Sequence, residues 1–247
     1  MIGRYELGEL LEQYGIDAKK VINNNTNVLN YGEYNEIKMV LDYLMNELHM
    51  LPKNIEKCPS VLYFKVDAIK ENYQFLINHK VNISDIETCL HVLSTESLEL
   101  KKTYDYILEN YGIKYLNSIT SILKVSVDRI KEIEKFNLSK DVTLSASISR
   151  ISLEEIEKII KVCRENNIEI TGNVFLKPAE EIEKIIKVCR ENNIEITGSI
   201  FFKSAEEIEK IIKVCHENNI EITGSVFLKP AEEIEKIIKV CHENNIE

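Results

Sequence analysis

Hydrophobic residues in the C-terminal part of the chain recur with the period of an amphipathic α-helix. In the segment that begins at Glu180 they fall at positions i, i+3, i+4 and i+7, which lie on one stripe of a helix. These residues are Ile182, Ile185, Ile186 and Cys189. Glutamates come early in this segment and lysines late, as the helix dipole favours. The pattern predicts a surface helix whose apolar stripe faces a core.

This helical segment is repeated almost without change. The ten residues Glu-Glu-Ile-Glu-Lys-Ile-Ile-Lys-Val-Cys begin at Glu154, Glu180, Glu206 and Glu232, at intervals of 26 residues. Since one such unit cannot bury its stripe alone, we expect each unit to be stabilised by stacking on its neighbours. The charged pairs Glu180–Lys184 and Glu183–Lys187 are expected to form i,i+4 ion pairs on a solvated face.

Between the long helices we expect a turn and a second, shorter helix. Asn192-Asn193 is expected to supply the left-handed residue that ends the long helix. Ile194-Glu195-Ile196 alternates like a strand, so a strand-plus-helix solenoid is the alternative. A short helix is favoured because the equivalent upstream stretch, Ser84-Asp85-Ile86-Glu87, has the form of a capping box. In the short units Thr197 would take the role of Ser84, and residues 199–202 would form a turn or two.

The same unit extends over most of the chain. The residues that open the short element are Cys58, Cys89, Ser121, Ser147, Asn173, Ser199 and Ser225, with steps of 31, 32, 26, 26, 26 and 26 residues. An earlier unit is expected over Asp17 to Leu48, with Tyr34–Leu41 as its long helix. We therefore predict an all-α, right-handed α-solenoid of about eight two-helix units. Residues 1–150 would hold the diverged units, and residues 151–247 the near-identical ones, continuous with the first part.

Composition narrows the class of protein. No run reaches the roughly 18 apolar residues that span a bilayer, and the first residues lack a signal-peptide pattern, so we expect a cytoplasmic protein with no membrane partner. The six cysteines are interpreted as small buried apolar residues. The net charge of −10 opposes generic nucleic-acid binding, which depends on Lys and Arg that neutralise phosphates.

The diverged units carry a family resemblance. Its residues are Ile55-Glu-Lys-Cys58-Pro59-Ser-Val-Leu62 and Tyr73-Gln-Phe75-Leu76, with echoes at Tyr104-Asp-Tyr106-Ile-Leu108 and Tyr111-Gly112-Ile113. They resemble the helical repeats of the mitochondrial transcription termination factor (mTERF) family and its bacterial look-alikes, over about residues 16 to 150. The resemblance implies a curved solenoid that binds nucleic acid through a basic concave groove. The chain departs from the family in its acidic charge and in lacking an Arg- and Ser-rich transit peptide.

Three columns of residues vary between the near-identical units and are therefore the candidates for ligand contact. The first column is Arg164, Arg190, His216 and His242, which would form a ladder that contacts a partner; the alternative is that these residues only complement the helix C-terminus. The second is Asn173, Ser199 and Ser225, interpreted as helix caps rather than as ligand-reading positions. The third is Leu176, Phe202 and Leu228, interpreted as core.

No arrangement of residues indicates catalysis, and no cofactor or metal site is expected. The five histidines lack metal-ligand spacing, and His216 and His242 lie one repeat apart. Cys215 precedes His216, but adjacent helix positions diverge by about 100°. The protein is therefore expected not to be an enzyme.

The leading functional hypothesis is a protein–protein interaction scaffold. Its alternative is an mTERF-like nucleic-acid-binding protein, with contacts from Lys19, Lys20, Lys101, Lys102, Arg129 and Lys131. A third hypothesis is an acidic inhibitor or mimic that acts on a nucleic-acid-binding enzyme. The apolar stripe of the last helix (Ile234, Ile237, Ile238 and Cys241) is expected to be partly exposed or covered by another molecule, so end-to-end self-association is also a hypothesis.

Overall fold

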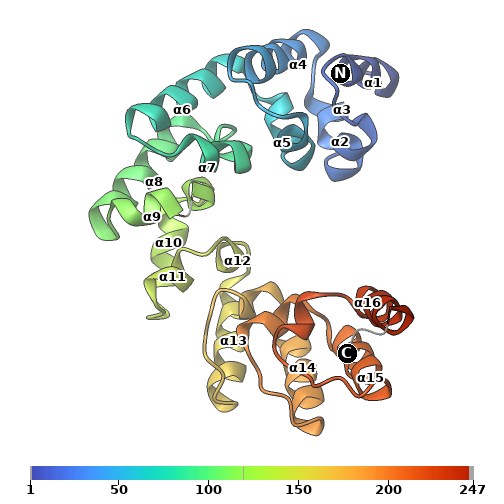
Figure 1. Ribbon diagram of the computed structural model, residues 1–247. Helices are drawn as coiled ribbons and strands as arrows, with labels where there is room; N and C mark the ends of the chain where they lie inside the picture. Colours follow the sequence, from blue (N-terminus) through green and yellow to red (C-terminus); the bar gives the residue numbers. More distant parts are fainter. Residues whose placement is uncertain (1, 119, 245–247) are drawn as a thin grey trace. The chain divides into compact units, whose positions relative to one another are not determined.

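The computed structural model describes residues 2–118 and 120–244. This part of the chain is helical and contains no strand, which confirms the all-α prediction and rules out the strand-plus-helix alternative there. It forms two compact units, Met1–Arg129 and Ile130–Glu247, and the boundary falls inside a helix (Figure 1). None of the described helices is long and apolar enough to cross a membrane.

Unit 1 alternates longer helices with short ones. Its α-helices are α1 (Arg4–Gln13), α2 (Ala18–Asn24), α3 (Asn27–Tyr31), α4 (Tyr34–Leu41), α5 (Pro52–Lys57), α6 (Val66–Asn78), α7 (Ile83–Thr88), α8 (Ser97–Asn110) and α9 (Ile113–Ser118). A π-helical turn η1 (Asp42–Glu47) continues α4, and the 3₁₀ turns are η2 (Pro59–Tyr63), η3 (Leu90–Val92) and η4 (Thr120–Lys124). The long helix expected at Tyr34–Leu41 is confirmed as α4.

Unit 2 contains the near-identical segments. Helix α10 (Val127–Glu134) crosses the boundary, and α11 (Lys140–Thr143) and α12 (Ala146–Ser149) follow it. The long helices are α13 (Leu153–Glu165), α14 (Ala179–Glu191), α15 (Ala205–Glu217) and α16 (Ala231–Glu243), and the 3₁₀ turns between them are η5 (Val174–Leu176), η6 (Gly198–Phe202) and η7 (Val226–Leu228). Each long helix packs against the next one along the chain (Figure 1).

Asparagine in the left-handed region ends each long helix, as the sequence predicts. Asn167, Asn193 and Asn219 have φ of 55°, 52° and 55°. At the end of α14, the Ile194 N–H donates to the Cys189 carbonyl (2.8 Å) and the Asn193 N–H donates to the Arg190 carbonyl (3.3 Å). These two bonds form a Schellman motif, which satisfies carbonyls that a helix end otherwise leaves unpaired.

The predicted second short helix is confirmed as a single turn, of 3₁₀ type between the near-identical segments. Each of the opening residues lies within one residue of the start of a helix of three to five residues. The expected caps differ from the observed ones. Thr197 precedes η6 but makes no side-chain cap, and its Oγ1 lies 2.9 Å from Ser199 Oγ instead. Upstream, Asn82 rather than Ser84 caps α7 by accepting the Ser84 N–H.

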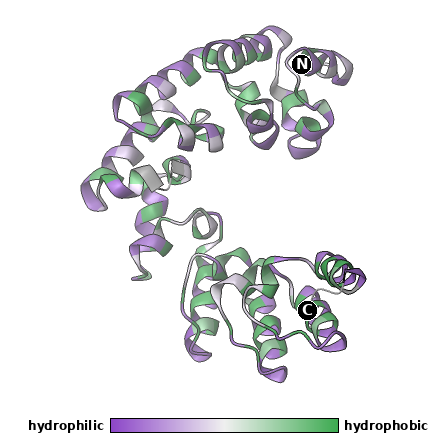
Figure 2. Ribbon diagram, in the orientation of Figure 1, coloured by the Kyte–Doolittle hydropathy of each residue, from purple (hydrophilic) through white to green (hydrophobic). Residues whose placement is uncertain are grey.

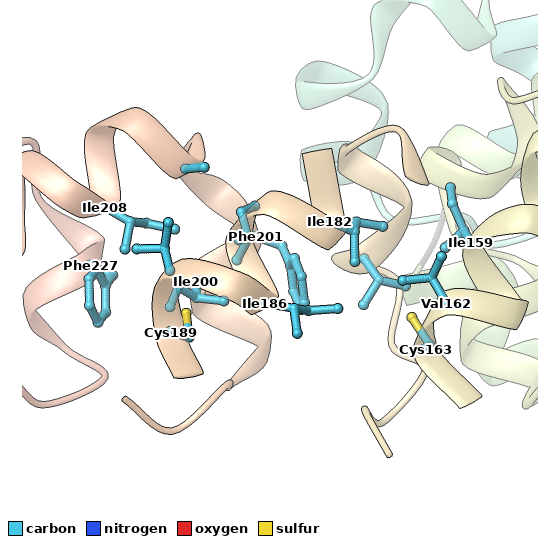
Figure 3. Packing of buried hydrophobic residues seen from close by; sticks show 14 of the residues in the cluster. Ile159, Val162, Cys163, Ile182, Ile186, Cys189, Ile200, Phe201, Ile208 and Phe227 are labelled. Atoms are coloured by element: carbon cyan, nitrogen blue, oxygen red, sulfur yellow. The ribbon is translucent and has the colours of Figure 1, made fainter. Parts of the chain in front are cut away.

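The core of unit 2 is one continuous cluster of aliphatic side chains and phenylalanines. The predicted stripe Ile182, Ile185, Ile186 and Cys189 is buried. Hydrophobic residues gather where neighbouring helices meet, and Phe201 and Phe227 lie in the same row as the isoleucines (Figures 2 and 3). On α16 the equivalent stripe is partly exposed, as expected, since 44% of Ile237 is accessible whereas Ile211 of α15 is fully buried.

Candidate functional site

The first candidate column lies at the C-terminal ends of the long helices. Arg164, Arg190 and His216 are exposed on α13, α14 and α15, and the side chain of His242 lies outside the described residues. Arg164 borders an open cavity of about 500 Å³ whose wall includes Phe136 and Ile160. The column therefore offers accessible cations, but each of them is also the penultimate residue of its helix, a position that favours cations in any case.

The basic residues proposed as nucleic-acid contacts are mostly neutralised by carboxylates. Lys20 Nζ lies 3.2 Å from Glu56 Oε2, and Lys101 Nζ lies 2.6 Å from Glu71 Oε1. Lys102 Nζ lies 2.7 Å from Glu99 Oε1. The hydrogen bond from Lys101 holds the pKa of Glu71 below its usual value, and the bond to Glu56 raises the pKa of Lys20.

The remaining members of this set do not add a basic groove. Lys19 is exposed on α2, and Arg129 and Lys131 of α10 have interaction partners of their own. An open cavity of about 460 Å³ beside Lys102 is bordered mainly by acidic residues. They are Glu99, Asp105, Glu109 and Asp128. A phosphate backbone would be repelled there.

Part of the acidity of unit 2 has a structural role. The carboxylate of Glu155 accepts the backbone N–H of Ala179, the first residue of the next helix, at 2.7 Å. Glu181 and Glu207 bind the first N–H of α15 and α16 in the same way, at 2.8 Å. We call Glu155, Glu181 and Glu207 the glutamate ladder. Because both partners lie in first turns, neighbouring long helices run parallel.

Other surface pairs differ from those expected. The i,i+4 pair that was predicted at the start of the helix is seen as Glu154–Lys158 (3.0 Å) and Glu206–Lys210 (2.8 Å). In α14, however, Lys184 contacts Glu181 at 3.8 Å rather than Glu180. The expected Glu183–Lys187 pair is replaced by Lys187–Glu191 at 3.9 Å. These exposed pairs contribute little, because long flexible side chains in water hold no fixed geometry.

The second column connects units and does not cap helices. Asn173 and Ser225 precede η5 and η7 without a side-chain cap bond. The Ser199 hydroxyl donates to the carbonyl of Gly224 in the next unit at 3.3 Å, and Ser147 donates to Gly172 at 2.7 Å. The capping interpretation is therefore wrong, and the serines of this column take part in packing between units.

The third column is on the surface, which corrects its assignment to the core. Leu176, Phe202 and Leu228 are 47%, 53% and 62% exposed, whereas the preceding residues Phe175, Phe201 and Phe227 are at most 3% exposed. A 3₁₀ turn has three residues per turn, so consecutive side chains point in three directions and an apolar run cannot be buried as a whole. We call Leu176, Phe202 and Leu228 the apolar column.

The apolar column has a defined setting. Successive 3₁₀ turns η5, η6 and η7 contact one another, so equivalent residues follow each other along unit 2. Pro178 and Pro230 are exposed nearby, and a lysine follows each member of the column directly in the chain. Arg190 follows the start of its helix by 11 residues, about 16 Å along the axis. The apolar column and the Arg/His column are therefore at opposite ends of the long helices.

The cysteines fall into two groups. Cys163, Cys189 and Cys215 are fully buried, as expected, and burial raises the pKa of Cys163 and of Cys189 to about 11. Cys58 and Cys89 are only half-buried and lie beside His91, so their assignment as buried apolar residues is wrong. Within the described part of the chain, no group of three His, Cys, Asp or Glu residues is placed to hold a metal ion.

No family model matches this sequence, and no curated protein or solved structure is significantly similar to it.

Proposed function

We propose that the protein is a non-enzymatic helical-repeat scaffold that binds another protein through the apolar column of unit 2. The observation that carries the proposal is that Leu176, Phe202 and Leu228 are about half exposed or more, at equivalent positions of successive units. Single exposed apolar residues are ordinary on a protein surface, whereas a contiguous apolar patch marks an interaction site.

The residues around the column suggest the chemistry of the partner. Lys177, Lys203 and Lys229 follow the three apolar residues, and exposed Arg150 occupies the equivalent position of the preceding unit. Lys229 is paired with Glu233, while in the described part of the chain Lys177 and Lys203 have no ion-pair partner. A segment with apolar side chains flanked by carboxylates would complement this surface in shape and charge.

Nucleic acid is the less favoured ligand. Lys20, Lys101 and Lys102 are held in ion pairs with carboxylates, which would have to break before a phosphate could bind. The acidic-mimic hypothesis is also weakened, because the glutamate ladder is directed at backbone N–H groups of neighbouring helices.

The proposed architecture is the right-handed α-solenoid of about eight units, similar to the mTERF family, that the sequence predicts. Its support is the regular succession of a one-turn helix and a longer helix from Pro59 to Glu243. The upstream units include one more short helix, such as α7, before the one-turn helix. This extra helix accounts for their greater length.

The test is a selection of peptides from a random displayed library on the immobilised full-length chain. We expect the selected peptides to share apolar residues flanked by Asp or Glu, and to bind with dissociation constants in the micromolar range. The variant Leu176→Ser/Phe202→Ser/Leu228→Ser should lose this binding. The matched control Arg164→Ala/Arg190→Ala/His216→Ala, altered at the opposite ends of the helices, should keep it.

Two outcomes would overturn the proposal. One is equal binding of the selected peptides to the wild type and to the apolar-column variant. The other is tight, salt-dependent binding of labelled single- or double-stranded oligonucleotides that is lost when Lys19, Lys20, Lys101, Lys102, Arg129 and Lys131 are replaced by alanine. Light scattering at high concentration tests self-association separately, because a strictly monomeric mass contradicts it.

A further inference from the structure

The imidazole of His91 lies between two cysteine thiols of unit 1. Cys58 Sγ is 3.6 Å from His91 Nδ1, and Cys89 Sγ is 3.8 Å from His91 Nε2. The cysteines come from equivalent positions, since Cys58 directly precedes η2 and Cys89 directly precedes η3. These two turns contact each other, which brings together thiols that are 31 residues apart in the chain.

The two ring nitrogens give the histidine two roles at once. A neutral imidazole carries one N–H donor and one lone pair, so it accepts the S–H of one cysteine and donates to the sulfur of the other. When the ring takes a thiol proton, both nitrogens become donors and the resulting imidazolium stabilises the thiolate. The thiolate, and not the thiol, is the nucleophilic form of cysteine.

We propose that Cys58, His91 and Cys89 form a reactive thiol site whose substrates are small α,β-unsaturated carbonyl compounds. One thiol proton moves to His91, and the thiolate forms an S–C bond to the β-carbon of the compound. The C=C electron pair moves to the α-carbon, which takes a proton from the imidazolium. The addition has no leaving group and needs no oxidant.

Accessibility separates this site from the other cysteines of the chain. Cys58, Cys89 and His91 are partly exposed, so a small molecule can reach the sulfurs. Cys163, Cys189 and Cys215 are 0% exposed in the core of unit 2. Cys241 is partly exposed on α16 and serves as the internal comparison.

The sulfurs are not placed to share a metal ion or to support a different use of the site. They lie at opposite nitrogens of one ring and so do not converge on one point. The proposal is independent of the apolar column, which lies in unit 2. Failure of one proposal therefore leaves the other unaffected.

The experiment uses the full-length chain, a limiting amount of N-ethylmaleimide and peptide mass spectrometry at several times. In the wild type we expect Cys58 and Cys89 to be labelled at least about tenfold faster than Cys241, since a positioned base accelerates proton transfer by that factor or more. His91→Gln should lower both rates to that of Cys241. Continued protection of Cys163, Cys189 and Cys215 in this variant shows that the fold is retained.

A second pair of variants keeps the test decisive if His91→Gln unfolds the chain. In Cys58→Ser, the remaining Cys89 still has His91 as its proton acceptor and should react as fast as in the wild type. The reverse holds for Cys58 in Cys89→Ser. Labelling of Cys58 and Cys89 no faster than that of Cys241 in the wild type overturns the proposal, as does full reactivity in a folded His91→Gln.

Discussion

Phe201 and Phe202 are neighbours in η6, but their side chains have different surroundings. Phe201 is 1% exposed and lies among the isoleucines of the core, whereas 53% of Phe202 is accessible (Figure 3). Their contributions to stability should therefore differ strongly, although the residue type and the local backbone are the same.

Replacement of each phenylalanine by alanine tests this difference. Phe201→Ala should lower the free energy of unfolding by about 3–5 kcal/mol, because it leaves a cavity in a packed core. Phe202→Ala should lower it by less than about 1 kcal/mol, because much of the side chain is already in water. Urea titration followed by circular dichroism measures both. Comparable losses would mean that the apolar column is buried after all.

Asn193 offers a second test at this scale, through its backbone. Its φ of 52° costs an ordinary L-residue about 1–2 kcal/mol. Asn193→Val should therefore destabilise the protein by roughly that amount, and Asn193→Gly should be neutral or slightly stabilising. Thermal unfolding of the two variants decides; equal melting temperatures would contradict the left-handed assignment.

Features of single residues were predictable from the sequence where they depend on local geometry. The stripe through Ile182 and the left-handed Asn193 follow from helix periodicity and from the backbone preference of asparagine. Phe202 was assigned wrongly because an apolar run does not reveal that its turn is 3₁₀. The contact of Cys58 with His91 joins residues 33 positions apart, which no local pattern indicates.

At the level of the helices, the glutamate ladder links the start of each long helix to the previous one. Each carboxylate accepts a first-turn N–H that has no partner within its own helix. A charged acceptor strengthens such a bond and also complements the positive end of the helix dipole. The ladder therefore contributes to the parallel stacking of α13 to α16.

Glu207 and its neighbour Glu206 form a matched pair for testing the ladder. Glu207→Ala removes the acceptor for the Ala231 N–H and should cost about 1–2 kcal/mol. Glu206→Ala removes only the exposed ion pair with Lys210, and its effect should be within about 0.5 kcal/mol. Glu207→Gln should retain much of the stability. Chemical unfolding of the three variants provides the comparison, and equal effects of the two alanine variants would contradict the role of the ladder.

The order of the long helices follows from the repeat, but the ladder was not predictable. Identical segments at intervals of 26 residues must make equivalent contacts, so stacking of each helix on the next was expected. Nothing in the sequence distinguishes Glu155 from Glu154, since both are first-turn glutamates of the same helix. Only the approach of the next helix, 24 residues later, gives Glu155 its different role.

For the whole molecule, the buried thiols of unit 2 predict a loss of stability in alkaline solution. The pKa of Cys163 and of Cys189 is about 11 in the folded chain, against 9.0 for an exposed thiol. The folded-state pKa lies above the unfolded one, so the contribution to stability is complete below pH 9 and is lost as the pH rises through 11.

Urea unfolding at pH 8 and at about pH 10.5 measures this loss. The variant Cys163→Ala/Cys189→Ala should be less stable at pH 8 because of the cavities, but it should lose less stability than the wild type on going to the higher pH. Equal losses would assign the alkaline effect to tyrosines and lysines instead.

The repeated junction in unit 2 also affects how such a chain can change in length. Glu155, Glu181 and Glu207 make the same bond to the next helix, so each unit presents the same contacts to its neighbours. Recombination between two copies of the encoding DNA, in register, would add or remove 26 codons. Every junction in the product would still join the same residues. Array length can therefore vary in a single genetic step, without a new packing interface having to evolve.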